Sequence, residues 1–279
     1  MPELPEVETT RRGLARILEG ATIARVEVRR RDLRWPLPVD LEARLEGRQV
    51  RRLTRRAKYI LAEMDDNGVW LIHLGMSGRL IVERANHNRP SRREEKHVHM
   101  VVETTVGDAM LYQDYRRFGS MDWVPLSSLG GHPRLVSLGV EPLSDELSGK
   151  CLHRRLAGRI APLKAALLDQ RLIAGLGNIY VCEALNRAGL SPFREAGSLS
   201  LAESTGLAVA IKQTLEAAIA AGGSSLRDYV QTDGELGYFQ HAWRVYGREG
   251  ETCSCNRDSI ILRAVQSGRS TFYCPACQA

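Results

Sequence analysis

Apolar residues recur at helical spacing near the start of the chain. Within residues 5–18, Val7, Leu14, Ile17 and Leu18 repeat with a helical period, and glycine follows shortly afterwards. The sequence therefore predicts a first helix over residues 5–18.

Short β-rich runs follow this helix, separated by turn residues or polar breaks. These runs cover residues 23–28, 59–64, 69–74, 80–82, 99–105 and 110–112. This half of the chain is therefore predicted to form a β-sandwich or barrel-like layer that carries at least one helix.

Helical patterns dominate after the LGGHP segment at residues 129–133. Pro162 suits the first turn of a helix running to about residue 172. A glycine turn precedes a second helix over residues 178–188. Ser200 and Glu203 form an S-x-x-E capping box in front of a third helix. The next stretch, residues 224–240, has little periodicity and is predicted to be a loop.

Composition places the chain among ordinary globular proteins. It has 279 residues, of which 43% are hydrophobic and 26% are charged, so a sizeable core can form. At about 150 residues per domain, this length predicts two domains with a small appendage. The acidic N-terminus lacks the basic start of a signal peptide, and no apolar run approaches the roughly 18 residues that span a bilayer. We expect a cytoplasmic, nucleoid-associated protein.

The positive charge is concentrated in clusters. There are 39 Lys and Arg against 33 Asp and Glu, which gives a net charge of 39 − 33 = +6. The clusters contain Arg29, Arg30, Arg31, Arg51, Arg52, Arg55, Arg56, Lys58, Arg89, Arg92, Arg93 and Lys96. Such bunching favours a polyanionic partner over a merely solvated basic surface.

Four of the six cysteines lie close to the C-terminus. They form two close pairs, Cys253 with Cys255 and Cys274 with Cys277, separated by a segment of hairpin length. In a cytosolic chain this spacing favours a zinc site over disulfides. Cys151 and Cys182 lie alone in helical patterns and are interpreted as small apolar residues.

The opening MPELPEVE carries the strongest chemical signal. Removal of the initiator methionine would expose the secondary amine of Pro2, a nucleophile able to form an iminium ion with a sugar carbon. Glu3 could protonate a ring oxygen or relay protons. In an arbitrary protein Pro2 would simply end a tail, so this interpretation needs support from the rest of the chain.

That support comes from a resemblance along the full chain. The start MPELPEVETTRRGL resembles bacterial formamidopyrimidine-DNA glycosylases, which remove 8-oxoguanine from DNA. Further motifs are RRAKYI at 55–60, HLGMSGRL at 73–80, DYRRFG at 114–119, GLGNIY at 175–180, QTDGELGYF at 231–239, VYGREGE at 245–251 and GRSTFYCPAC at 268–277. The sister endonuclease VIII family usually has Gly in place of Leu4, so LPEVE favours the oxidised-purine enzymes.

The resemblance implies catalytic roles for four residues. Pro2 matches the nucleophile that forms the Schiff base, Glu3 the general acid, and Lys58 the lysine that serves β-elimination and contacts phosphate. Arg269 matches the finger arginine that contacts phosphates around the lesion and is linked to δ-elimination. Without the resemblance, Lys58 would be interpreted as phosphate-contacting or solvated, and Arg269 as a solvated hairpin arginine.

DNA-binding roles follow from the same resemblance. Met76, Arg116 and Phe118 match the residues that enter the base stack when the lesion is everted, although Met76 and Phe118 alone would be interpreted as core. The other implied DNA contacts are His73, His97, Arg159 and Asn178. The Gly-rich turn before Asn178 leaves helix N–H groups that suit a phosphate oxygen. In the family, the loop at residues 226–240 closes over the damaged base.

Two positions depart from the family pattern. Relatives usually carry Cys-x-x-Cys in both halves of the finger, whereas this chain has Cys253-Ser254-Cys255 and places Asn256 at the usual second ligand position. A four-cysteine zinc site is still expected, and its alternative is a finger held by packing with weakened or absent metal. Tyr115 replaces a proline, which would change loop stiffness.

The resulting hypothesis is an α+β protein. It comprises an N-terminal catalytic β-sandwich domain with flanking helices (residues 1–131), a helical helix–two-turn–helix domain with the lesion-recognition loop (132–244), and a C-terminal β-hairpin zinc finger with one structural Zn2+ (245–279). As the resemblance implies, this monomer binds double-stranded DNA containing oxidised bases or abasic sites. It removes oxidised purines, and it cleaves the strand by β,δ-elimination. The alternatives are an endonuclease VIII-like enzyme for oxidised pyrimidines and a non-catalytic DNA-binding relative.

Overall fold

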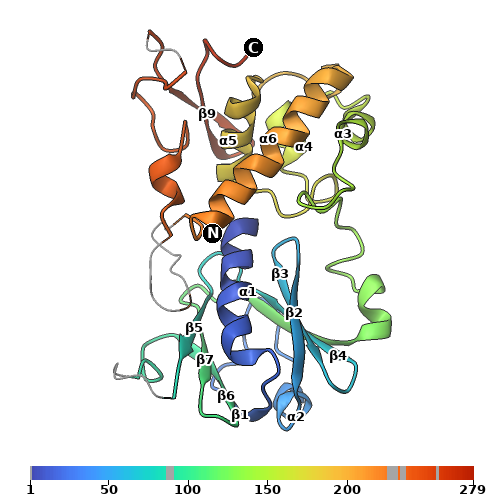
Figure 1. The fold of residues 1–279 in the computed structure, drawn as a ribbon, viewed down its shortest axis with the longest axis vertical. Helices are drawn as coiled ribbons and strands as arrows, with labels where there is room; N and C mark the ends of the chain where they lie inside the picture. The colour runs from blue at the N-terminus through green and yellow to red at the C-terminus, as the bar shows by residue number, and fades with distance from the viewer. Residues whose placement is uncertain (1, 86–90, 225–231, 233–236, 256–257) are drawn as a thin grey trace. The chain divides into compact units, whose positions relative to one another are not determined.

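The computed structural model contains two compact units, each formed from two stretches of the chain (Figure 1). It describes residues 2–85, 91–224, 232, 237–255 and 258–279. The first unit comprises Met1–Val136 and Ala221–Gln240, and the second comprises Ser137–Ala220 and His241–Ala279. No helix in the described part of the chain is long and apolar enough to cross a membrane.

The first helix forms as its periodicity predicts. Helix α1 spans Leu4–Leu18, one residue earlier than expected, and begins with a capping box between Glu3 and Glu6. Its buried face includes Leu14 and Leu18, both fully buried. Gly20 follows with a φ of 79°, a left-handed conformation that ends the helix at little cost for glycine.

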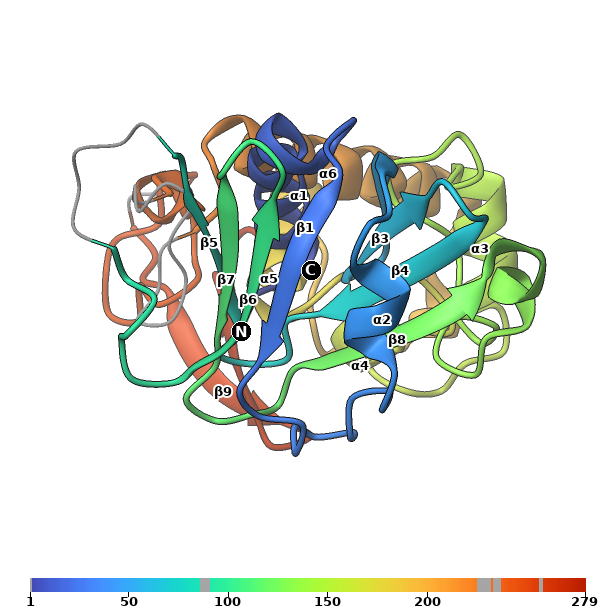
Figure 2. The same cartoon turned by 90° about the horizontal axis from the view of Figure 1, so that it is seen from below.

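Two four-stranded antiparallel sheets make up most of the first unit, as separate layers (Figure 2). Their orders are β1-β6-β7-β5 and β2-β3-β4-β8. The elements of this part of the chain, after α1, are β1 (Ile23–Val28), α2 (Leu41–Leu45), β2 (Val50–Arg56), β3 (Tyr59–Met64), β4 (Gly68–His73), β5 (Arg79–Glu83), β6 (Val98–Thr104), β7 (Ala109–Gln113), β8 (Ser120–Pro125) and the 3-10 helix η1 (Leu126–Gly131). The predicted sandwich is confirmed.

A single apolar cluster joins α1 to both sheets. It contains Leu14 from α1, Met110 from β7 and Trp70 from β4, all of them fully buried. Each sheet therefore buries one face against the other and against α1. Strands β2 and β8 were absent from the sequence prediction, and β2 reads VRRLTRR, whose basic residues hide its β character.

Helices dominate the second unit together with one hairpin. The helices are α3 (Gly149–Leu156), α4 (Leu163–Leu167), α5 (Asn178–Ala188) and α6 (Leu201–Ala220), with the 3-10 helix η2 (Ala196–Ser198). The hairpin is formed by β9 (Leu262–Gln266) and β10 (Arg269–Tyr273), and a further 3-10 helix η3 spans Phe239–Ala242. The predicted capping box of α6 forms, because Ser200 N donates to Glu203 Oε2 at 2.8 Å and Glu203 N to Ser200 Oγ at 3.2 Å.

Helix α4 is much shorter than the sequence predicts. It ends at Leu167 instead of about residue 172. The amide of Gln170 bonds to the carbonyls of Leu168 and Leu176 at 3.1 and 2.8 Å, and its Oε1 accepts from Gly175 N at 2.9 Å. These bonds satisfy backbone groups of the following turn and stabilise a non-helical path to α5.

A buried glutamate anchors the start of the finger segment to α5. The carboxylate of Glu183 accepts hydrogen bonds from three consecutive backbone N–H groups, those of Arg244, Val245 and Tyr246, at 2.8, 3.0 and 2.8 Å. Such a carboxylate fixes the backbone direction, because moving the segment would strand a buried charge. The hairpin that follows is therefore attached to the helical core.

Candidate functional site

Two buried carboxylates lie beside Pro2 at the N-terminal end of α1. Pro2 is itself buried, and Glu3 and Glu6 expose 3% and 2% of their surfaces. Glu6 Oε2 accepts from the Glu3 backbone N–H at 2.9 Å, which fixes the residue directly after Pro2. Carboxylates are favoured at this end of a helix, where the free N–H groups are concentrated.

The same Glu6 carboxylate reaches the segment that follows α6. Its Oε1 accepts from Ser224 N at 2.9 Å. Farther along, the carbonyl of Thr232 accepts from Val82 N at 2.8 Å. The loop expected over residues 226–240 lies largely outside the described residues, at 225–231 and 233–236. Its described parts belong to the first unit, and Thr232 among them lies against Gly13 of α1 and bonds to β5.

Lys58 occupies the tip of a tight hairpin. Strand β2 ends at Arg56 and β3 begins at Tyr59, which leaves Ala57 and Lys58 as a two-residue connection. Ala57 has a φ of 53°, as such turns require, although it is not glycine. Lys58 therefore lies in the turn at the end of these two strands and not within a strand.

His73 is a half-buried, neutral histidine close to Lys58. Its ring centroid lies 4.7 Å from that of Tyr59. Burial, with the nearby charges of Lys58, Arg134 and Arg34, lowers the pKa of His73 to about 4. His73 Nδ1 accepts from Gly75 N at 3.1 Å, a bond that only the imidazole with Nδ1 unprotonated can accept.

Stability should therefore fall on acidification. The pKa of His73 is about 4 in the folded chain against 6.5 ordinarily, so its neutral form contributes fully above about pH 6.5 and this contribution is lost as the pH falls towards 4. That shift corresponds to about 3 kcal/mol. We expect His73→Asn to flatten the decline in unfolding free energy measured by denaturant titration between these pH values. The exposed His241 supplies the control, and an identical decline in His73→Asn and His241→Asn would contradict this assignment.

One buried aspartate organises the loop that carries Arg116 and Phe118. Asp114 is fully buried, and its carboxylate accepts from Ser77 Oγ at 2.5 Å, Tyr112 OH at 2.7 Å and Gly119 N at 2.8 Å. It also accepts from Arg116 N at 3.3 Å. These bonds fix both ends of the loop that contains Tyr115.

Three candidate base-stack residues project from this region. Met76 and Phe118 expose 37% and 38% of their surfaces, so neither belongs to the core. The Arg116 guanidinium carbon lies 4.5 Å from the centroid of the Phe118 ring, a cation–π distance. His97 adopts a φ of 70°, and its carbonyl accepts from Asp114 N at 3.1 Å. His97 and the Arg116 loop are thus joined through one residue.

The predicted residues of the second unit gather around the hairpin and α5, except for one. Asn178, the first residue of α5, donates from Nδ2 to the Ser270 carbonyl at 2.9 Å. That carbonyl and Thr271 Oγ1 also accept from the buried Lys164 ammonium, at 2.9 and 2.7 Å. The strand after the exposed Arg269 is therefore fixed to the helices. Arg159 instead pairs with Asp169 at 3.7 Å.

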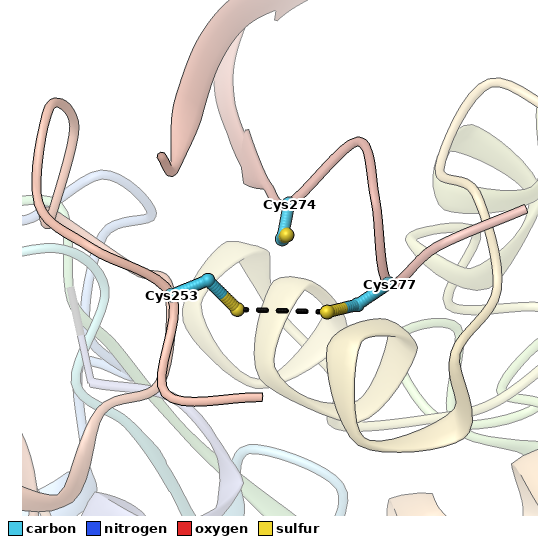
Figure 3. Close-up of side chains that lie close together, drawn as sticks. All are labelled: Cys253, Cys274 and Cys277. Atoms are coloured by element: carbon cyan, nitrogen blue, oxygen red, sulfur yellow. Dashed lines mark hydrogen bonds between the residues drawn. The ribbon is translucent and has the colours of Figure 1, made fainter. Parts of the chain in front are cut away.

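Three of the four finger cysteines converge (Figure 3). The sulfurs of Cys253, Cys274 and Cys277 all lie within 4.8 Å of one another, with 3.7 Å between Cys253 and Cys277. A tetrahedral zinc ion with Zn–S bonds of about 2.3 Å requires sulfurs roughly 3.8 Å apart, so this arrangement is compatible with a zinc site. Cys255 is exposed, and its Sγ accepts from Arg244 Nη2 at 2.6 Å. Its backbone N–H points to Cys253 Sγ at 3.4 Å.

Sequence reasoning overlooked three buried polar residues that organise this chemistry. Glu6, Asp114 and Lys164 expose 2%, 0% and 1% of their surfaces. The E-x-x-E spacing of a capping box could have revealed Glu6. Asp114 lies within the DYRRFG motif, but the groups that bond to its carboxylate come together only in the folded chain. Lys164 contacts the hairpin 106 and 107 residues away, so no local pattern indicates its role.

Comparison with protein families covers most of the chain. Residues 1–121 match the formamidopyrimidine-DNA glycosylase N-terminal domain, and residues 138–230 match the formamidopyrimidine-DNA glycosylase H2TH domain. Proteins named formamidopyrimidine-DNA glycosylase from Cereibacter sphaeroides and Paracoccus denitrificans are each 54% identical to it, with 100% of both chains covered.

Solved structures agree with this assignment. A Lactococcus lactis FPG mutant in complex with Fapy-dG containing DNA has a TM-score of 0.88 and 32% identity, with 99% of each chain covered. The MutM (FPG) protein from Thermus thermophilus has a TM-score of 0.86 and 39% identity, covering 99% of this chain and 98% of that one. Wild-type Lactococcus lactis FPG in complex with oxidised pyrimidine containing DNA has a TM-score of 0.87 and 32% identity, with 99% of each chain covered.

Proposed function

Since the chain belongs to the formamidopyrimidine-DNA glycosylase family, it is a base excision repair glycosylase with AP lyase activity, and we propose that it removes oxidised purines through Pro2. The substrates are 8-oxoguanine and formamidopyrimidines in duplex DNA. The observation that carries this proposal is the pair of buried carboxylates, Glu3 and Glu6, beside Pro2.

The reaction begins once Met1 has been removed and the Pro2 nitrogen is free. That nitrogen attacks C1′ of the everted nucleotide, the bond from C1′ to the base breaks, and the proton that the nitrogen loses passes to the departing base. Glu3 supplies the proton that opens the sugar ring at its oxygen, and the sugar remains attached to Pro2 as an iminium ion. The buried surroundings of Pro2 and Glu3 support this step, because they limit competing attack by water.

Strand cleavage follows from the iminium ion. Its positive charge acidifies the C2′ proton, whose removal expels the 3′ phosphate in β-elimination. A second elimination expels the 5′ phosphate, and hydrolysis of the iminium then frees Pro2. Lys58 serves the first elimination and contacts phosphate, and Arg269 holds phosphates during the second. The hairpin position of Lys58 and the exposure of Arg269 support these roles.

Extrusion of the nucleotide leaves a gap that the first unit fills. Met76, Arg116 and Phe118 enter the base stack, with Arg116 facing the orphan cytosine. Their side chains offset part of the few kcal/mol of unstacking that base flipping costs. The exposure of Met76 and Phe118 and the contact of Arg116 with Phe118 support this role, because large apolar groups at the surface are ready to insert.

Four further residues are proposed to contact phosphates of the duplex. His73 and His97 belong to the first unit, and Arg159 and Asn178 to the second. Arg159 must leave Asp169 to reach DNA. The N-terminus of α5, with Asn178 at its first position, supplies N–H groups that suit a phosphate oxygen.

The enzyme acts as a monomer in the cytoplasm, in association with the nucleoid. Its three domains comprise residues 1–131, 132–244 and 245–279.

One structural zinc ion completes the finger. Cys253, Cys274 and Cys277 supply three thiolates, and Cys255 supplies the fourth after its sulfur leaves Arg244. Only one residue separates Cys253 from Cys255, so both sulfurs can bind the same ion only in a tightly constrained geometry, and Cys255 is the strained ligand. The zinc has no part in the reaction chemistry and stabilises the hairpin that carries Arg269.

Metal analysis tests this ligand set. We expect one zinc per chain in the wild type, and less than half of that in Cys274→Ser, because a structural site loses most of its affinity with a ligand. The matched control is Cys151→Ser, outside the cluster, which should retain one zinc. In the cobalt-substituted protein, thiolate charge-transfer absorbance should fall by about a quarter in Cys255→Ser if four thiolates bind. Unchanged absorbance in that variant would contradict the fourth ligand.

Borohydride trapping tests the proposed activity. The purified enzyme is incubated with borohydride and a duplex that bears 8-oxoguanine opposite cytosine, beside a dihydrouracil duplex. We expect a covalent adduct that forms preferentially with 8-oxoguanine. No adduct with either duplex would support the non-catalytic DNA-binding alternative.

Preferential trapping with dihydrouracil would instead favour the endonuclease VIII-like alternative. The Lactococcus lactis complex gives this second candidate a specific basis, because that wild-type relative is bound to oxidised pyrimidine containing DNA. Comparing the two duplexes in one experiment therefore distinguishes the three functions.

A further inference from the structure

An exposed tryptophan lies between two arginines in the first unit. Trp35 exposes 50% of its surface, and the guanidinium carbons of Arg34 and Arg134 lie 6.0 and 5.4 Å from its ring centroid. Both distances fall within cation–π range. Arginines held on an aromatic ring keep their outer N–H groups available, a combination that nucleic-acid-binding surfaces use.

The loop that presents Trp35 is fixed at both ends. Leu33 and Leu37 are buried in the core cluster on either side of it. Leu37 N donates to the Arg31 carbonyl at 3.0 Å and closes the loop. Arg31 Nη1 also donates to the Pro38 carbonyl at 3.0 Å. Trp35 is therefore held outside the core by a defined backbone path, because its two apolar neighbours are already inserted.

The charges of these arginines reach the hairpin that carries Lys58. Burial is the main cause of the low pKa of His73, and the charges of Lys58, Arg134 and Arg34 lower it further. For Tyr59, burial raises the pKa while Arg134 and Arg34 oppose that effect. Tyr59 and His73 are in ring contact at 4.7 Å. Strand pairing places Arg134 near the same site, because it lies 3.9 Å from Asp122, and Asp122 pairs with Leu71, two residues before His73 on β4.

An acidic neighbour neutralises this positive charge only in part. Asp122 lies 3.9 Å from Arg134 Nη1, but it also approaches His132 Nε2 at 3.1 Å. The Arg134 and Asp122 side chains are partly exposed, at 23% and 31%, so water weakens their attraction. A phosphate that approaches Arg134 can therefore compete with Asp122.

We propose that Arg34, Trp35 and Arg134, together called the Trp35 surface, bind the phosphate backbone of the duplex beside the nucleotides held at Lys58 and His73. The two guanidinium groups donate to phosphate oxygens, while the indole orients them and packs against deoxyribose. The inference rests on the proposed function, because it requires a duplex at Lys58. It adds an electrostatic contact that does not depend on base sequence, as damage scanning requires.

The salt dependence of DNA binding tests the Trp35 surface. The probe is a duplex that contains a tetrahydrofuran abasic analogue, which the enzyme binds without cleaving. Each phosphate contact contributes about 0.9 to the slope of log affinity against log salt. The double variant Arg34→Ala/Arg134→Ala should therefore lower the magnitude of that slope by about 2 and weaken binding at least tenfold at low salt. Trp35→Leu should weaken binding in the same direction, because the guanidinium groups lose their support.

The chain offers a matched control. Arg44 lies 5.8 Å from the ring centroid of Trp123, so Arg44→Ala removes the same kind of pair without touching the Trp35 surface. Its slope should equal that of the wild type. Thermal unfolding is measured for every variant, and Trp35→Phe, which keeps an aromatic ring, replaces Trp35→Leu if the latter unfolds. An unchanged slope in the folded double variant, or an equal change in Arg44→Ala, overturns the proposal.

A parallel experiment distinguishes failure of the proposed function from failure of the Trp35 surface. Wild-type enzyme is trapped with borohydride on the 8-oxoguanine duplex in parallel with the binding measurements. If the wild type traps and the slopes do not differ, the Trp35 surface alone is refuted. If the wild type binds the analogue with the expected slopes but does not trap, the Trp35 surface stands and the glycosylase chemistry is refuted.

Discussion

Pro2→Gly is expected to lower the rate of borohydride-trapped adduct formation by about 10²-fold on a duplex with 8-oxoguanine opposite cytosine. Glycine still offers a terminal amine, but it lacks the ring that fixes the nitrogen beside Glu3. The precise placement of a nucleophile contributes this much, because a displacement near 1 Å costs about two orders of magnitude. Single-turnover trapping measures the rate without interference from product release.

A proline elsewhere in the same unit supplies the control. Pro125 ends β8 and is exposed, so Pro125→Gly introduces the same chemical change away from α1. It should trap at the wild-type rate. Mass spectrometry of each intact protein verifies that Met1 has been removed, because an acylated Pro2 nitrogen cannot react. Wild-type trapping in fully processed Pro2→Gly would contradict Pro2 as the nucleophile.

Asp114→Ala should have the largest effect on folding. The change leaves the buried donors of Ser77, Tyr112 and Gly119 without the carboxylate that accepts from them at 2.5, 2.7 and 2.8 Å. Each stranded buried donor costs about 1–3 kcal/mol, with partial relaxation, so we expect a total loss of about 3–4 kcal/mol in the free energy of unfolding. Denaturant titration measures it.

Asp114→Asn separates charge from shape. Its amide keeps one acceptor but presents N–H groups to donors, so the expected loss is smaller, about 1–2 kcal/mol. The exposed Asp145 provides the control, and Asp145→Ala should change stability by less than about 0.5 kcal/mol. Equal losses in Asp114→Ala and Asp145→Ala would show that the Arg116 loop does not depend on the buried carboxylate.

Local patterns predicted those elements whose hydrophobic period is complete. Helix α1 and helix α5 follow their sequence patterns almost to the residue, as does strand β3. Strand β2 escaped detection because its basic side chains interrupt the β pattern. Helix α4 was predicted too long because the side chain of Gln170, which redirects the backbone, acts through contacts that no helical period reveals.

Some residues of the candidate site could likewise be predicted from the sequence, and others could not. Reactive residues such as Pro2 and Lys58 lie in motifs that the sequence displays, and their family could be identified from those motifs. The exposure of Met76 and Phe118 could not be deduced from their apolar character alone, which favours a core position. The supporting groups were hidden, because Asp114 and Lys164 act on partners that only folding brings near.

Mapping the covalent bond tests the central claim, that Pro2 is the nucleophile, most directly. The adduct trapped on the 8-oxoguanine duplex is digested with protease and nuclease, and the modified peptide is sequenced by tandem mass spectrometry. The sugar remnant should be attached to the nitrogen of Pro2 in a peptide that begins PELPEVE. A remnant on Lys58, or on any other residue, would contradict the assignment.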